Sequence, residues 1–122
     1  MVDAYLRVQR ALNADSLAGI VAEARTIAAE SSTLGSGAPA VQAPAGDLEK
    51  ATTLAAARAA FGKIGDAIIA DAKASGMSFG NDVKVAYCPM ANKRWLQRGG
   101  VVQNPFYGKS MSDCGRIENG VK

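Results

Sequence analysis

The sulfur-containing side chains in the last third of this chain fall into two short groups. The first is "CPM" at residues 88–90, and the second is "MSDC" at residues 111–114. Thiolate and thioether are soft ligands, which select Cu(I) over hard cations. The chain contains no histidine, which argues against Zn²⁺ and Cu²⁺ sites because these usually recruit imidazole. The candidate ligands for Cu(I) or Ag(I) are therefore Cys88, Met90, Met111 and Cys114.

The same two cysteines allow other interpretations. A Cys88–Cys114 disulfide would close a loop of about 26 residues and stabilise the fold by roughly 3–4 kcal/mol in the chain-entropy model. Both thiols could also be buried and unpaired, and single methionines often fill gaps in a core. An isolated reactive Cys88 would suggest a thiol redox protein. From the residues alone, a disulfide is slightly favoured over a metal site.

Trp95 and a group of basic residues lie between the two sulfur groups. Trp95 is the only tryptophan, and we expect it to pack in the core or to lie over a bound monovalent cation. From residue 84 to residue 116 there are six basic residues and one acid. They form either a solvated face or a docking patch for an acidic partner. The net charge of +3 is too small to indicate nucleic acid.

No set of catalytic residues is evident. Ser110 and Ser112 lack a histidine that could act as a base, and we find no glycine-rich loop that would hold a phosphate. We therefore expect a protein that is not an enzyme and that has no organic cofactor.

The first 75 residues are rich in alanine and have helical periodicity. Apolar residues repeat at helical spacing near 3–13, 15–33 and 48–74, where Asp47 is a candidate N-cap and Gly76 a stop signal. The stretch "GSGAPAVQAPAG" at 35–46 has two prolines and no charge, which is typical of a loop. These patterns predict a three- to four-helix antiparallel bundle over residues ~3–75. Helices with this much alanine could also pack against a second copy, so a homodimer is possible.

Residues 76–122 have a different character. Alternation predicts a short strand over 83–87, and a second strand is possible at 101–103. We therefore predict a mainly α fold, in which a loop-rich cap over ~76–122 contains one or two short strands. The length of 122 residues suits a single domain, 1–122.

No apolar run approaches the roughly 20 residues of a membrane span, so we expect none. The start "MVDAYLRV" has no signal peptide. It fits either a cytosolic protein or a mature exported domain.

The order of motifs in the chain resembles that of a small bacterial periplasmic domain of unknown function. In that family Cys-Pro-Met-Ala is followed by Trp-Leu, Asn-Pro-Tyr-(Tyr/Phe)-Gly and Met-x-x-Cys-Gly. This sequence has "CPMA" at 88–91, "WL" at 95–96, "NPFYG" at 104–108 and "MSDCG" at 111–115. The opening "YLRVQRALNADS" is also similar, so the resemblance spans nearly the whole chain. Two departures, the glycine- and alanine-rich stretch at 35–46 and "GGVVQ" before Asn104, lie away from the sulfur residues.

The resemblance has implications for location and function. The family domain occurs alone with a signal peptide, or fused to periplasmic adaptor subunits of copper/silver heavy-metal efflux systems. It implies a helical bundle with a motif-rich cap, a periplasmic location and a role in copper or silver handling. The partners would be efflux or copper-enzyme components. The motif residues of the cap beside the sulfur ligands are Pro89, Asn104, Pro105, Tyr107 and Gly108. With the resemblance included, metal binding is favoured over a disulfide alone.

Overall fold

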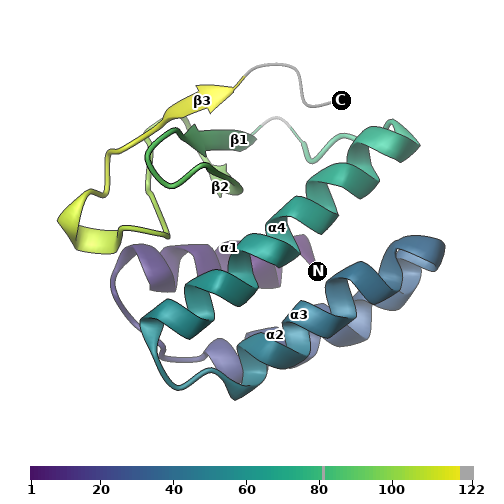
Figure 1. The fold of residues 1–122 in the computed structure, drawn as a ribbon. Coiled ribbons are helices and arrows are strands. Elements are labelled where there is room, and N and C mark those ends of the chain that lie inside the picture. Colours follow the sequence, from purple (N-terminus) through teal and green to yellow (C-terminus); the bar gives the residue numbers. More distant parts are fainter. Residues whose placement is uncertain (81, 119–122) are drawn as a thin grey trace.

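The computed structural model describes residues 1–80 and 82–118, which form a mixed α/β domain (Figure 1). The helices are α1 (Val2–Asn13), α2 (Ile20–Glu30), α3 (Ala38–Lys50) and α4 (Leu54–Ser75), with short 3₁₀ segments at Ser31–Gly37 and Gly108–Ser110. The strands are β1 (Val83–Cys88), β2 (Lys93–Arg98) and β3 (Arg116–Glu118). The prediction of a helical bundle with a loop-rich cap is therefore wrong, because residues 83–118 contain an antiparallel sheet in the order β2-β1-β3.

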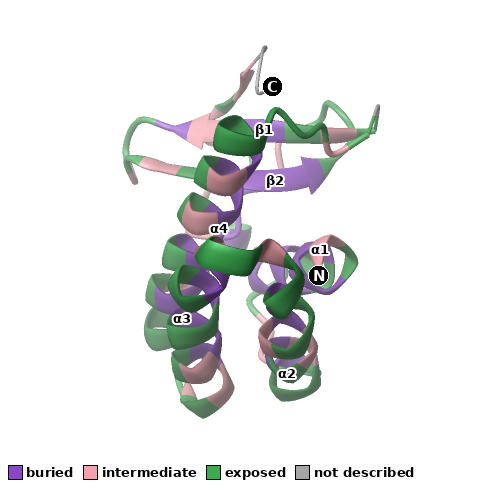
Figure 2. Cartoon of the chain, turned by 90° about the vertical axis from the view of Figure 1, so that its right-hand side faces the viewer, coloured by how far each residue is buried: buried purple, intermediate pink, exposed green. Residues whose placement is uncertain are grey.

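Three layers make up the described structure. The sheet lies on one side of α1 and α4, and α2 and α3 lie on the other (Figures 1 and 2). β2 is the edge strand next to the helices. The buried Tyr5 hydroxyl of α1 accepts a hydrogen bond of 3.1 Å from the Leu96 N–H, which satisfies a backbone donor on the outer edge of this strand.

One continuous core joins the helices to the sheet. The rings of Tyr5 and Phe61 stack with centroids 4.4 Å apart, and Phe106 lies 6.1 Å from Phe61 and 5.9 Å from Trp95. Aromatic pairs at such distances add to the stabilisation from buried area. The residues after 76 are therefore part of the same core as the helices.

The predicted helices were correct in type but wrong in several boundaries. α1 agrees with the prediction for 3–13, and α4 ends before Gly76, whose φ of 71° terminates the helix. The helix predicted at 15–33 begins only at Ile20, because Asp15 and Gly19 have positive φ. α4 begins after Thr53, whose side chain accepts a hydrogen bond from the Ala56 N–H, so the predicted cap at Asp47 lies inside α3 instead.

The predicted loop at 35–46 is wrong, because most of it belongs to α3. Pro39 lies in the first turn, where its missing N–H has no helical partner in any case. Pro44 lies inside the helix, where it removes a hydrogen bond and is normally costly. Val41, Ala45 and Leu48 are fully buried at helical spacing against α2 and α4. The stabilisation from this packing outweighs the preference of the prolines and glycines for a loop.

The second strand was also predicted in the wrong place. Residues 101–103 are not a strand. β2 instead consists of "KRWLQR", and the basic residues at both of its ends hide its strand pattern in the sequence. Trp95, Leu96 and Gln97 are all buried, so the strand does not alternate between buried and exposed positions as a half-solvated strand would.

Candidate functional site

The two cysteines lie together at one end of the sheet. Cys88 is the last residue of β1 and is fully buried, and Cys114, just before β3, is half-buried. Their Sγ atoms are 2.9 Å apart, and both are free thiols. The antiparallel register that places Tyr87 opposite Arg116 brings the two segments side by side. The unpredicted strand β3 is thus the element that positions Cys114.

The turn after Cys88 surrounds its sulfur with hydrogen-bond donors. Residues 89–92 connect β1 to β2, with Cys88 opposite Lys93 in the register. The backbone N–H groups of Met90 and Ala91 lie near the Cys88 sulfur and lower the pKa of its thiol. Asn92 closes the turn with a φ of 52° and accepts a hydrogen bond from the Tyr87 hydroxyl. The "CPMA" motif is therefore a backbone cradle for one sulfur atom.

Asn104 connects the loop before β3 to this cradle. It is fully buried, and its side-chain amide donates to the Cys114 carbonyl at 2.9 Å. Its Oδ1 accepts from the N–H groups of Phe106 and Tyr107, and its side chain also lies near enough to the Cys88 sulfur to lower the pKa of that thiol. The "NPFYG" motif thus holds both cysteine segments in place through one side chain.

The rest of that motif is fixed by the helices. Arg58 of α4 donates to the carbonyls of Pro105 and Leu12 and pairs with Asp15 at 2.7 Å. Gly108 has a φ of 57°, and a Cβ there would lie 1.9 Å from the Asp15 carboxylate, so only glycine fits. Arg58 is a supporting residue that the sequence analysis missed; a lone arginine in an alanine-rich helix was its only signal.

The sequence analysis also missed Gln97, a polar residue of β2. Gln97 is fully buried; its Oε1 accepts from Trp95 Nε1 and the Gln103 N–H, and its amide donates to the carbonyls of Gly99 and Val101. Trp95 is also fully buried, and its ring edge approaches Gly115. This position agrees with the core-packing interpretation of Trp95, whereas its contact with a cation stays a prediction.

The two thiols differ in acidity. Burial opposes ionisation of Cys88, but hydrogen bonds from the Cys114 thiol, the Ala91 and Met90 N–H groups and the Asn104 amide lower its pKa. The hydrogen bond to the Cys88 sulfur, with burial and nearby negative charge, raises the pKa of Cys114 to about 11. In the reduced pair, Cys88 is therefore the more acidic of the two thiols.

The two methionines of the predicted ligand set differ in exposure. Met90 is 66% exposed, and Met111 is half-buried in the segment of Cys114. Within residues 1–80 and 82–118 no three Cys, Asp or Glu side chains gather at one point. The structure therefore brings together the two cysteines of the four predicted ligands.

Several other predicted features have structural roles. Ser112 Oγ accepts from Asn13, and Ser110 Oγ donates to the Tyr107 carbonyl. Arg94 and Arg116 lie over the Tyr87 ring, at 4.6 and 5.0 Å from its centroid. Arg94 also pairs with Glu118, and Arg98 with Asp3 and Asp82. Three of the six basic residues of the predicted patch, Arg94, Arg98 and Arg116, thus have acidic partners within the chain.

None of the helices in the described residues is both long and apolar enough to cross a bilayer. Comparisons with protein-family models, with curated proteins and with solved structures gave no match.

Proposed function

We propose that this chain is a periplasmic soft-metal-binding domain that holds Cu(I) or Ag(I) between Cys88 and Cys114. The observation that supports this proposal is the contact between the two sulfur atoms at 2.9 Å, at the point where two otherwise separate motifs meet. Two thiolates are a donor set suited to a soft monovalent cation. The location and the role in copper handling or heavy-metal efflux rest on the motif resemblance.

The unequal burial of the sulfurs defines a route for the metal. Cys114 is half-buried and Cys88 is fully buried, so an arriving ion contacts Cys114 first. Cys88 then supplies the second thiolate, which its backbone cradle already stabilises. Transfer to an efflux or copper-enzyme partner would reverse the order, because the partner's ligands reach the ion beside Cys114.

The sulfurs must move apart to accept an ion. Metal–thiolate bonds of about 2.3 Å place two sulfurs of one ion roughly 4 Å apart, which is more than the 2.9 Å observed. Rotation of the Cys114 side chain supplies this movement, since Asn104 fixes the backbone of that segment. Met111, in the same segment, is the candidate third ligand, whereas the exposed Met90 would have to turn inward.

Anaerobic titration of the reduced protein with Cu(I) against a chelator tests the proposal. We expect the protein to withdraw one equivalent of Cu(I), and the Cys88→Ala/Cys114→Ala variant to withdraw none. Met90→Leu is the matched control and should bind as the unmodified protein does. A failure of the unmodified protein to compete, or undiminished binding by the double variant, would refute the proposal.

The same sulfur contact favours one alternative, a disulfide-stapled interaction module of the envelope that has no catalytic role. Only a small approach would bring the sulfurs to the bonding distance of about 2.05 Å. A disulfide and a two-thiolate metal site exclude each other at any one time. Mass spectrometry without reductant, on protein from an oxidising compartment, distinguishes them: loss of both thiol hydrogens supports the staple, and two free thiols contradict it.

A further inference from the structure

A second feature of interest lies at the opposite end of β1 from the sulfur pair. A cavity of about 260 Å³ opens between the start of α1, the last turns of α4 and the beginning of β1. Val83 lines it, and five residues further along the strand stands Cys88. At about 3.3 Å per residue the two sites are roughly 17 Å apart. The cavity is therefore separate from the proposed metal site.

The walls of this cavity are mainly apolar. Ile68 in this lining is buried, and Leu34, Phe79 and Val83 are half-buried. Met77 is 58% exposed although it lines the cavity. An apolar concavity of this kind can remove the hydrocarbon part of a small ligand from water.

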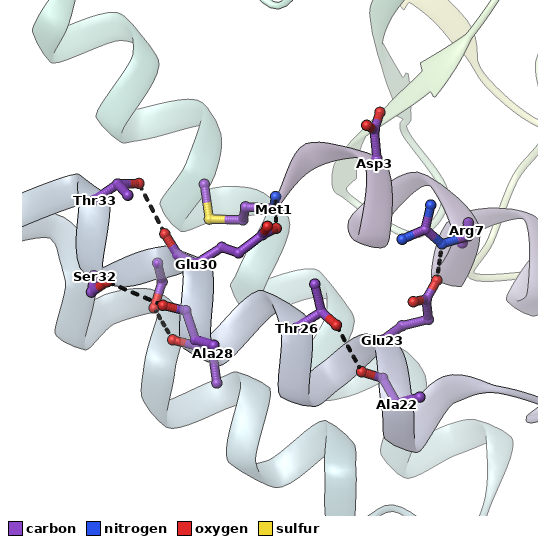
Figure 3. A network of polar contacts seen from close by, with 12 residues as sticks. Met1, Asp3, Arg7, Ala22, Glu23, Thr26, Ala28, Glu30, Ser32 and Thr33 are labelled. Carbon is purple, nitrogen blue, oxygen red and sulfur yellow. Dashed lines mark hydrogen bonds and ion pairs between the residues drawn. The ribbon is translucent and has the colours of Figure 1, made fainter.

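The charged residues of the cavity are unbalanced. Asp3, Asp71 and Asp82 contribute three carboxylates, and the cations of the lining are the Arg98 guanidinium and the Met1 ammonium, which pairs with Glu30. Arg98 pairs with Asp3 at 2.9 Å and with Asp82 at 2.5 Å. Figure 3 shows that Asp3 points away from the polar contacts that join α1 to α2. Among the described residues, no ion pair or side-chain hydrogen bond occupies the Asp71 carboxylate.

Gly37 makes room for that carboxylate. A Cβ at residue 37 would lie 2.7 Å from Asp71 Oδ1, so any larger residue would displace the carboxylate. The carboxylate of Asp71 therefore packs against bare backbone at the margin of an apolar cavity, and no cation within residues 1–80 and 82–118 pairs with it.

We propose that this cavity binds a small organic cation, an aliphatic amine whose ammonium group pairs with Asp71 and whose chain lies against Ile68, Phe79 and Val83. Charge complementarity selects the cation, because the Met1 ammonium pairs with Glu30 and Arg98 pairs with Asp3 and Asp82, so that neither cation of the lining pairs with Asp71. An ammonium ion supplies the hydrogen-bond donors that Asp71 lacks. Neutral or anionic ligands with the same hydrocarbon chain would leave Asp71 unpaired.

Nuclear magnetic resonance titration with the hexylammonium ion tests this proposal. We expect saturable shifts at Ala72, Phe79 and Val83, and weaker or absent shifts with hexanol and hexanoate. Asp71→Asn should weaken hexylammonium binding by about tenfold or more, as expected for loss of a charge-assisted hydrogen bond. Absent shifts, or equal binding of hexanol and hexylammonium, would overturn the proposal.

Three variants sharpen the test. Gly37→Ala keeps every charge but displaces the Asp71 carboxylate, so it should weaken binding as well. Asp47→Asn removes an exposed carboxylate on α3 and should leave binding unchanged. The Cys88→Ala/Cys114→Ala variant should bind hexylammonium normally, so failure of the metal proposal and failure of the amine proposal can be told apart. Unchanged binding by both Asp71→Asn and Gly37→Ala would refute the role of Asp71.

Discussion

At the scale of single residues, the site depends on an asymmetry between two cysteines. Cys88 is buried among polar groups that lower the pKa of its thiol, whereas Cys114 is half-exposed and has a raised pKa. The sequence identifies both residues but cannot reveal this difference, because the donors to Cys88 are backbone N–H groups and the distant Asn104. The asymmetry makes Cys88 the more acidic thiol and Cys114 the residue that meets incoming ligands.

This asymmetry predicts how the two thiols titrate. In a Cys114→Ala variant the pKa of Cys88 should rise, because the variant removes the thiol donor that lowers it. In a Cys88→Ala variant the pKa of Cys114 should fall from about 11, because the Cys88 sulfur is its largest perturbation. Ultraviolet absorbance of the thiolates against pH measures both, with the double Cys→Ala variant as baseline. A Cys88 pKa unaffected by loss of Cys114 would contradict the asymmetry.

At the scale of secondary structure elements, hydrophobic periodicity predicts those helices and strands whose signals are local in the sequence. α1, most of α4 and β1 were predicted because their apolar spacing and the stop at Gly76 are local signals. α3 was missed because two prolines suggested a loop, although its buried face against α2 and α4 decides its state. β2 and β3 were missed because buried polar residues such as Gln97 and charged ends hide their strand pattern. Of the four predicted ligands, the two cysteines converge.

Because α4 approaches α1 and β2 closely, we expect alanine substitutions at two of its glycines, Gly65 and Gly62, to change the stability of the protein unequally. A Cβ at Gly65 would lie 2.8 Å from the Tyr5 hydroxyl, which Leu96 holds in place. Gly65→Ala should therefore destabilise the protein by about 1–2 kcal/mol, after the gain in helix propensity is subtracted. Chemical denaturation measures the change.

Gly62→Ala is the matched control on the same helix. A Cβ there meets Phe106 at 3.4 Å and the flexible Lys93 side chain at 3.5 Å, so the helix gains up to about 1 kcal/mol in propensity. If Gly65→Ala were as stable as Gly62→Ala, the close contact between α4 and Tyr5 would be wrong.

At the scale of the whole molecule, arginine side chains connect elements that are distant in the sequence. Arg58 links α4 to the end of α1 and to the loop at Pro105. Arg94 links β2 to β3 through Glu118. The Arg58 hydrogen bond lowers the pKa of Asp15, and the Arg94 hydrogen bond lowers that of Glu118. The fold is therefore expected to weaken in acid.

The sign of this acid effect follows from the lowered pKa values. Each carboxylate stabilises the fold above its unfolded pKa of about 4, and that stability is lost as the pH falls through the lower folded value. Asp15→Asn should reduce the fall in unfolding free energy below about pH 4, and asparagine tolerates the positive φ at this position. Urea denaturation at a series of pH values measures this.

Glu49→Gln is the control for the acid effect, because the Glu49 pair with Arg25 is exposed. It should behave as the unmodified protein does. An Asp15→Asn variant with the full acid dependence would show that the link between Arg58 and Asp15 does not contribute.

The central claim is that Cys88 and Cys114 together bind one soft metal ion. X-ray absorption spectroscopy of reduced protein loaded with one equivalent of Cu(I) tests it most directly, because it identifies the atoms bound to the metal. We predict sulfur ligands in the unmodified protein and in Met90→Leu, and their loss in Cys88→Ala/Cys114→Ala. A copper environment of nitrogen and oxygen alone, or sulfur ligation that survives in the double variant, would contradict the claim.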